Sequence, residues 1–131
     1  MKVIEKVAWI HIEDRRVLML RSRGKDAFYF PGGKPEGNES IAQAITRELR
    51  EELGITFRPA STVLIGPPFR APAHGRDGVT LECRCVTGEH SGTFVPQSEI
   101  EELRFFSYDE RHELTPMGRL VFEFLGREGY I

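Results

Sequence analysis

Residues 33–55 read GKPEGNESIAQAITRELREELGI, and this stretch decides the fold expected for the chain. At about 100° per residue, residues 39–53 have the periodicity of an amphipathic helix. Its apolar arc is formed by Ile41, Ala42, Ile45, Leu49 and Leu53. Asn38 precedes the pattern and Gly54 follows it, so we expect Asn38 to cap the helix and Gly54 to end it.

Three glutamates of this helix lie away from its solvent face. Glu48, Glu51 and Glu52 border the apolar arc, and Glu52 projects into it. Carboxylates spaced i, i+3 and i+4 lie on adjacent turns and repel each other unless a cation sits among them. A hard divalent cation such as Mg²⁺ or Mn²⁺ prefers oxygen ligands of this kind, and it would also bridge to substrate phosphates. The alternative is a helix whose glutamates only keep it solvated and pair with arginines.

Gly32 and Gly33 come shortly before this helix. Glycine lets the backbone approach a metal or a phosphate closely and adopt conformations closed to other residues. The alternative is an ordinary tight turn.

The rest of the chain indicates a mixed α/β fold in one domain, residues 1–131. Strands are predicted at residues 3–12, 16–20, 28–30, 55–65, 79–86 and 103–106, with a hairpin turn at 13–15. Residues 66–78 are rich in Pro, Gly, Arg and His and are predicted to be a loop. Thr115 and Pro116 are typical of the cap and first residue of a helix, which we expect to run to about residue 125.

Composition excludes several classes of protein. A net charge of −2 gives no general attraction to nucleic acid polymers or anionic membranes. No signal peptide or membrane-spanning stretch is visible, so we expect a cytoplasmic protein. Cys83 and Cys85 are interpreted as small buried hydrophobic residues in a reducing compartment.

The helix and its flanks resemble the Nudix box, G-x5-E-x7-R-E-U-x-E-E-x-G-U, where U is a bulky aliphatic residue. Every defined position is matched, by Gly33, Glu39, Arg47, Glu48, Leu49, Glu51, Glu52, Gly54 and Ile55. A chance match is on the order of one in ten million per window. Residues 17–21, 30–34 and 101–106 also resemble segments of this family. The chain is therefore similar to the Nudix hydrolases, in particular to their compact, MutT-like members.

The resemblance implies an α/β/α sandwich with a mixed β-sheet. It also implies hydrolysis of a diphosphate linkage in a nucleoside triphosphate or related nucleoside diphosphate derivative, by attack of a metal-activated water on phosphorus. The implied ligands of Mg²⁺ or Mn²⁺ are Glu48, Glu51, Glu52 and the backbone carbonyl of Gly32. Residues with an implied structural role around these ligands are Gly33, Glu39, Arg47 and Gly54, with Glu39 and Arg47 forming ion pairs that orient the glutamates.

The general base is expected to be a box glutamate, Glu48 or Glu52. The second candidate is Glu99, just before the last strand, and the alternative for it is a solvated loop residue.

Substrate contacts are expected on both sides of the glycine-rich segment. Arg21, Arg23 and Lys34 are candidates for phosphate binding, and the alternative for each is a surface charge. Phe28, Tyr29 and Phe69 are candidates for stacking on a base, although Phe28 could equally be a core residue, where we place Phe30. We expect selectivity in the 66–78 loop, with Arg70, His74 and Arg76, although His74 is more typical of a loop histidine than of a base. Core or packing positions are predicted for Phe94, Leu120, Phe122, Phe124 and Leu125.

Three alternatives to a hydrolase are open at this point. A catalytically silent nucleotide-binding sensor of the same fold would usually lack one or more box glutamates, and all are retained here. A diphosphate isomerase would need a catalytic cysteine, and the only cysteines are the strand pair. The glutamate helix could also be an interaction surface. Homodimers are common among similar proteins, and the oligomeric state is left open.

Overall fold

Two β-sheets form the middle of the molecule, whose computed structural model describes residues 2–131. The first sheet consists, in order, of β5 (Gly32–Gly33), β1 (Lys2–Trp9), β8 (Val79–Thr87) and β7 (Val63–Pro72). β1 runs parallel to β8, whereas β5 and β7 are antiparallel to their neighbours. The predicted mixed sheet is therefore confirmed.

The second sheet is antiparallel. It consists of β10 (Ile100–Phe106), β3 (Arg16–Ser22) and β2 (Ile12–Glu13), with β4 (Phe28–Tyr29) also paired to β3. A small separate pair joins β6 (Thr56–Phe57) to β9 (His90–Ser91). The turn between β2 and β3 is where the sequence predicts it, and its Asp14 and Arg15 have φ angles of 51° and 61°.

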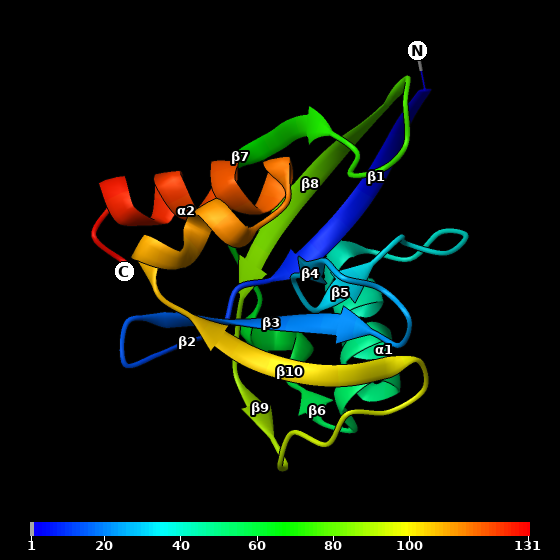
Figure 1. The fold of residues 1–131 in the computed structure, drawn as a ribbon. Helices are drawn as coiled ribbons and strands as arrows, with labels where there is room; N and C mark the ends of the chain where they lie inside the picture. Colours follow the sequence, from blue (N-terminus) through cyan, green and yellow to red (C-terminus); the bar gives the residue numbers. More distant parts are fainter. Residues whose placement is uncertain (1) are drawn as a thin grey trace.

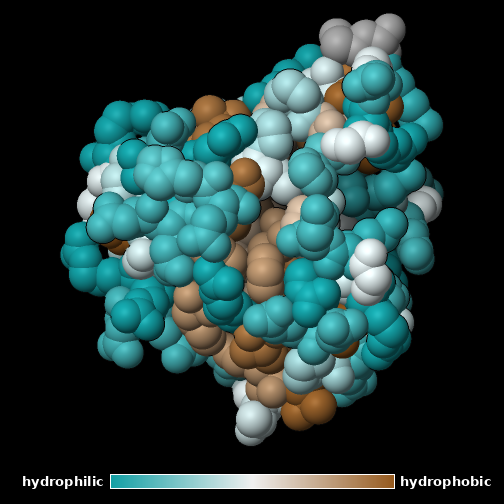
Figure 2. Space-filling model, in the orientation of Figure 1, coloured by the Kyte–Doolittle hydropathy of each residue, from teal (hydrophilic) through white to brown (hydrophobic). Residues whose placement is uncertain are grey.

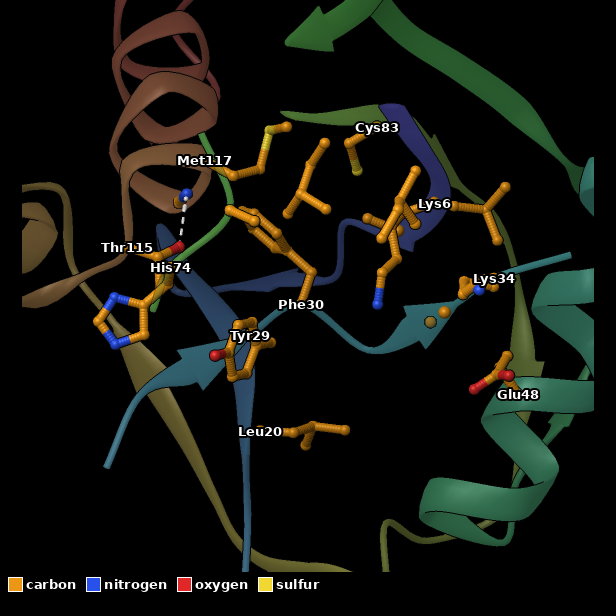
Figure 3. A pocket seen from close by; sticks show the side chains of 18 of the residues that line it. Lys6, Leu20, Tyr29, Phe30, Lys34, Glu48, His74, Cys83, Thr115 and Met117 are labelled. Atoms are coloured by element: carbon orange, nitrogen blue, oxygen red, sulfur yellow. Dashed lines mark hydrogen bonds between the residues drawn. The ribbon is translucent and has the colours of Figure 1, made fainter. Parts of the chain in front are cut away.

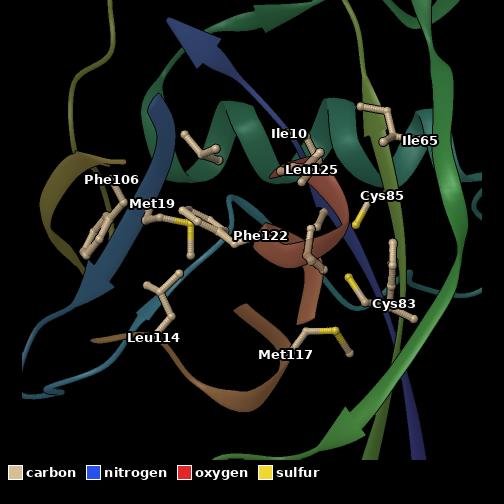
Figure 4. Close-up of a cluster of buried hydrophobic side chains, with 14 of the residues drawn as sticks. Ile10, Met19, Ile65, Cys83, Cys85, Phe106, Leu114, Met117, Phe122 and Leu125 are labelled. Carbon is tan, nitrogen blue, oxygen red and sulfur yellow. The ribbon is translucent and has the colours of Figure 1, made fainter. Parts of the chain in front are cut away.

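The two α-helices pack on opposite sides of these strands (Figure 1). α1 (Ile41–Leu53) buries Ile45 and Leu49 in a core that includes Trp9. α2 (Pro116–Arg127) buries Phe122 and Leu125 in the other core (Figure 4). Strands between two helical layers make the α/β/α sandwich that the resemblance implies.

The N-terminus of α1 differs from the prediction. Asn38 is not the cap, because the helix begins two residues later, after Ser40. Ser40 Oγ accepts the Gln43 N–H at 3.1 Å, and Gln43 Oε1 accepts the Ser40 N–H at 2.8 Å. This reciprocal capping box satisfies two backbone donors, whereas a cap at residue 38 would satisfy one. The C-terminus is as predicted, since Gly54 takes a left-handed φ of 69° and its N–H bonds to the Arg50 carbonyl.

The predicted strand at residues 3–12 is broken in the structure. The Ile10 N–H bonds to the Val86 carbonyl of the first sheet, and the His11 carbonyl accepts the Leu18 N–H of the second. The chain thus crosses from one sheet to the other between β1 and β2. A continuous apolar run does not reveal such a crossing, because both sides of it are buried.

The prediction for residues 55–78 is also wrong in two places. Residues 55–65 do not form one strand: β6 stops at Phe57, and the 3₁₀ turn η1 (Pro59–Ser61) precedes β7. The expected loop at 66–78 is largely strand, since β7 continues to Pro72 with a register shift between Ile65 and Phe69. Prolines are tolerated in this segment because β7 is the edge of its sheet and the bulge needs no ladder donor.

The remaining elements agree more closely with the prediction. Thr115 caps α2 by accepting the Gly118 N–H, and a 3₁₀ segment, η2 (Tyr108–Glu113), comes before it. Both cysteines are buried and unbridged, as expected. Leu120 is an exception, because 36% of it is exposed rather than packed. None of the helices in residues 2–131 has the length and hydropathy needed to cross a bilayer.

Candidate active site

The register of α1 directs its glutamates toward the edge of the first sheet. Because Leu49 and Leu53 are buried, the side chains one position before each of them lie at the border of the core. The Glu48 side chain is 15% exposed, whereas that of Glu51 is 55% exposed. Glu52 is also partly buried and reaches the backbone of β5.

Arg47 holds the carboxylate side chains around it in place. Its Nε and Nη2 donate to the two oxygens of Glu39 at 2.8 and 3.0 Å, a bidentate pair. Its Nη1 donates to Glu48 Oε1 at 2.7 Å and lies 3.4 Å from Glu51 Oε2. These hydrogen bonds raise the pKa of Arg47 and lower that of Glu39. The ion pairs implied for Glu39 and Arg47 are therefore present, and they orient the carboxylate of Glu48.

Gly32 and Gly33 form strand β5, not an isolated tight turn, and both need to be small. Gly32 has a φ of 136°, and a Cβ there would collide with the carbonyl oxygen of Val7 on β1. A Cβ on Gly33 would lie 2.8 Å from the carboxyl carbon of Glu48. The glycines thus let the carboxylates of α1 approach the sheet edge, where the Gly32 N–H donates to Glu52 Oε1 at 3.0 Å.

Burial and mutual repulsion disfavour ionisation of two of these glutamates. The pKa of Glu52 is raised to about 8, chiefly by burial and further by the charges of Glu48 and Glu99, against the Gly32 hydrogen bond, which lowers it. The pKa of Glu48 is raised by burial, and Arg47 partly offsets this. Carboxylates crowded in this way are stabilised by any cation that comes between them.

The residues present fit a hard divalent cation by their chemistry. Glu48, Glu51 and Glu52 offer only oxygen donors, and burial raises the pKa of Glu48 and of Glu52, so a cation between them would be stabilising. Within residues 2–131 no three acidic, His or Cys side chains converge on one point, and Glu51 is the most exposed of the three glutamates, 3.4 Å from Arg47. Glu48 and Glu52 are therefore the residues best placed to hold a cation.

A cavity of about 840 Å³ opens beside these glutamates (Figure 3). It extends from Glu48, Glu52 and Glu99 past β5 and β4 to the first turn of α2. The face of the molecule in Figure 2 shows an apolar strip through its middle, flanked by hydrophilic surface. This volume lies within the range of about 300–1,000 Å³ typical of small-molecule sites.

Most predicted site residues line this cavity. They are Phe28, Tyr29, Gly32, Gly33, Lys34, Glu48, Glu52 and Glu99, together with His74 and Arg76 of the predicted selectivity loop. Tyr29 is 41% exposed, so its ring is accessible to a ligand. Phe28 and Phe30 line the cavity and also pack against the α2 core, so stacking of Phe28 on a base stays a prediction.

Several predicted substrate contacts lie elsewhere. Arg21 bonds to Glu101 and Glu102 of β10 at 3.2 and 3.1 Å and is outside the cavity wall. Arg23 is exposed and also outside it, so phosphate binding by both arginines stays a prediction. The stacking role considered for Phe69 is wrong, because its ring is buried 5.3 Å from that of Phe124.

Other cavity residues are not evident from the sequence. Lys6, Cys83, Thr115 and Met117 come from β1, β8 and the start of α2. The sequence does indicate that Lys6 points toward the interior, because the alternation of β1 puts it on the same face as the apolar Ile4 and Ala8. Nothing local indicates that this face opens into a cavity.

The sequence of this chain is similar to a known protein family and to two pyrophosphohydrolases. The family model described as NUDIX domain matches residues 5–123. The chain is 46% identical over 59 residues to a CTP pyrophosphohydrolase of Escherichia coli, which is 42% of this chain and 44% of that protein. It is 46% identical over 58 residues to an RNA pyrophosphohydrolase of Halorhodospira halophila, which is 44% of this chain and 31% of that protein. Each match thus spans less than half of the relative's length.

A solved structure extends the similarity to nearly the whole chain. The solution structure of the E. coli ORF135 protein has a TM-score of 0.71 and 30% identity, with coverage of 96% of this chain and 91% of that one. The chain belongs to the Nudix family, as its matched domain, its complete box and its fold all show.

Proposed function

We propose that the protein hydrolyses a diphosphate linkage in a nucleoside triphosphate or a related nucleoside diphosphate derivative, with water attacking phosphorus, and that it requires Mg²⁺ or Mn²⁺. The observation that carries this proposal is the pair of partly buried carboxylates, Glu48 and Glu52, at the wall of a nucleotide-sized cavity. The names of the two pyrophosphohydrolases support the same class of reaction.

The box glutamates would hold the metal. In this proposal Glu48, Glu51 and Glu52 bind the cation together with the carbonyl of Gly32. When bound, such a cation lowers the pKa of a water molecule and offsets charge on phosphoryl oxygens. Arg47 keeps the Glu48 carboxylate directed at the site, and the Gly32 N–H does the same for Glu52.

A carboxylate of the same wall would accept the proton of the attacking water. Glu48 and Glu52 are the first candidates, since both side chains line the cavity at the site proposed for the cation and its water. Glu99 is the second, because it lines the cavity close enough for its charge to raise the pKa of Glu52. Loss of turnover in Glu99→Gln with metal affinity intact would assign the base to Glu99.

The other end of the cavity would hold the nucleoside. In this proposal the accessible ring of Tyr29 stacks on the base and Lys34, which lines the same cavity, meets phosphate. The free thiols of Cys83 and Cys85 suit a reducing compartment, which favours the cytoplasm.

A phosphate-release assay tests the proposal. The purified protein, with and without millimolar Mg²⁺ or Mn²⁺, is offered nucleoside triphosphates, nucleoside diphosphate sugars, ADP-ribose and dinucleoside polyphosphates. Glu52→Gln is compared with Glu123→Gln, which changes an exposed glutamate of α2 outside the cavity wall.

We expect metal-dependent hydrolysis that falls at least about 100-fold in Glu52→Gln and is unchanged in Glu123→Gln. Nucleotide binding without turnover of any substrate would overturn the proposal in favour of a silent nucleotide-binding domain.

A further inference from the structure

Lys6 lies in the middle of β1, yet its side chain faces the cavity. It pairs in register with Cys83 of β8, and both residues line the cavity. Its neighbours on the same face of the strand, Ile4 and Ala8, are only 7% and 3% exposed. Figure 3 shows the partly buried side chain of Lys6 extending into the space beside Phe30.

The ammonium group of Lys6 has no partner of its own. Among residues 2–131 it takes part in no ion pair and no hydrogen bond, unlike Arg21, Arg47 and Arg104, which are all paired with glutamates. An ammonium has three donors and no acceptor, and its partial burial without an acceptor is unfavourable. A ligand that brings an acceptor would relieve that cost.

The position of Lys6 indicates which part of a nucleotide it meets. Glu48 and Glu52 approach β5 from the α1 side of the sheet, where cation and phosphates belong. Lys6 is on the opposite face, covered by α2, where Cys83 and Met117 form an apolar wall. A flat, largely apolar ring fits this wall better than a phosphate does, which favours the base rather than the phosphates beside Lys6.

We propose that Lys6 is a specificity-determining residue whose ammonium donates a hydrogen bond to a carbonyl oxygen of the base. Guanine, cytosine and uracil each carry such an oxygen, whereas adenine has none and presents an exocyclic amino donor. Where the other bases place that oxygen, adenine would turn an amino donor toward the ammonium, a mismatch that hydrogen-bonding sites convert into selectivity. This inference rests on the proposed function only in taking a nucleotide to be the ligand.

A binding experiment without catalysis tests the assignment. Calorimetry in EDTA measures the affinities of GMP, CMP, UMP and AMP for the unaltered protein, Lys6→Met, Lys6→Arg and Lys2→Met. Lys2 is an exposed lysine of the same strand outside the cavity wall, so it is the matched control. We expect AMP to bind about 10- to 100-fold more weakly than at least one of the other three nucleotides. Lys6→Met should abolish this difference, while Lys6→Arg keeps most of it and Lys2→Met keeps all of it.

The outcomes separate this inference from the proposed function. Equal affinity for all four nucleotides in the unaltered protein would overturn the role of Lys6. An equal loss for all four in Lys6→Met would also overturn it, because Lys6 would then bind phosphate. Discrimination against AMP without hydrolysis of any triphosphate or diphosphate substrate of the panel in Mg²⁺ would support this inference and overturn the hydrolase. Hydrolysis of GTP, CTP, UTP and ATP at equal kcat/KM would support the hydrolase and overturn the role of Lys6 in selecting the base.

Discussion

The carboxyl carbon of Glu48 lies 2.8 Å from the point that a Cβ on Gly33 would occupy. At position 33 the space between the backbone and this carboxylate is therefore too small for a methyl group. The contact involves the far end of a flexible side chain, so an added methyl group would displace the carboxylate rather than the backbone. Gly33 is thereby linked to the position of Glu48 more than to the stability of the fold.

Gly33→Ala should therefore lower activity much more than stability. Since a displacement of about 1 Å at a catalytic group costs on the order of 100-fold, we expect kcat to fall by that factor. The melting temperature, measured by circular dichroism, should stay within a few degrees. Gly37→Ala is the opposite control, because residue 37 has a φ of 52° with no neighbour within 4 Å. It should lose stability through backbone strain and keep its kcat, and the reverse ranking of the two variants would contradict the argument.

Arg47→Lys should weaken metal binding even though the charge is kept. Lysine cannot reproduce the bidentate contact with Glu39 while also holding Glu48, so the Glu48 carboxylate would lose its orientation. We expect a loss of about 10- to 100-fold in Mn²⁺ affinity, measured by titration calorimetry, with a similar loss in turnover. Arg50→Lys, at an exposed site on the same helix, should change neither. Unaltered Mn²⁺ affinity in Arg47→Lys would show that Arg47 has no such role.

The capping box of α1 predicts a difference between two neighbouring variants. Ser40→Ala removes the side-chain acceptor of the Gln43 N–H and should lower the free energy of unfolding by about 1 kcal/mol. Asn38→Ala should change it by less than about 0.5 kcal/mol, because residue 38 is exposed and outside the helix. Urea denaturation of both variants measures the two values. A larger loss for Asn38→Ala would restore the cap expected from the sequence.

Acid should destabilise the protein through His90. Its ring stacks on Phe94 at 5.1 Å and meets the edge of Trp9 at 5.2 Å. Burial, with the nearby His11, lowers the pKa of His90 below its ordinary value of 6.5. As the pH falls below 6.5 the unfolded chain therefore takes up a proton before the folded one does, and stability declines until the folded-state pKa is passed.

Thermal unfolding followed by fluorescence of the single tryptophan, Trp9, measures this decline. Between pH 7 and pH 5 the melting temperature should fall less in His90→Gln than in the unaltered protein. His112→Gln changes an exposed histidine of η2 and should leave the decline as it is. Equal declines in all three proteins would remove His90 as the cause.

Much of the candidate site could be predicted because its determinants are local. The positions of Glu48, Glu51 and Glu52 around α1 follow from helical periodicity, and Gly54 ends the helix by its own left-handed conformation. The crowding of these carboxylates at one border of the apolar arc is enough to indicate a cation site. The orientation of Glu51 toward Arg47 was not predictable in this way, because it depends on a choice among side-chain rotamers.

Contacts between distant residues account for what the sequence did not reveal. Phosphate binding by Arg21 stays a prediction, but its pairing with Glu101 and Glu102, which follow it by 80 residues or more, could not be foreseen. Phe69 was expected to stack on a base, but it lies in a strand that bulges past two prolines and packs its ring on α2. No window of sequence around either residue contains its partner.

By itself the sequence determined helix α1, its carboxylate border, the N-terminal cap of α2 and the membership of the Nudix family. These features depend on hydrogen bonds and side-chain spacing within a few residues, which each segment carries with it. Only the tertiary structure decided that the chain changes sheets between β1 and β2, that β7 continues as an edge strand, and that Lys6 faces a cavity. Strand pairing and the space between layers arise from contacts among segments far apart in the chain, whose register local propensity does not specify.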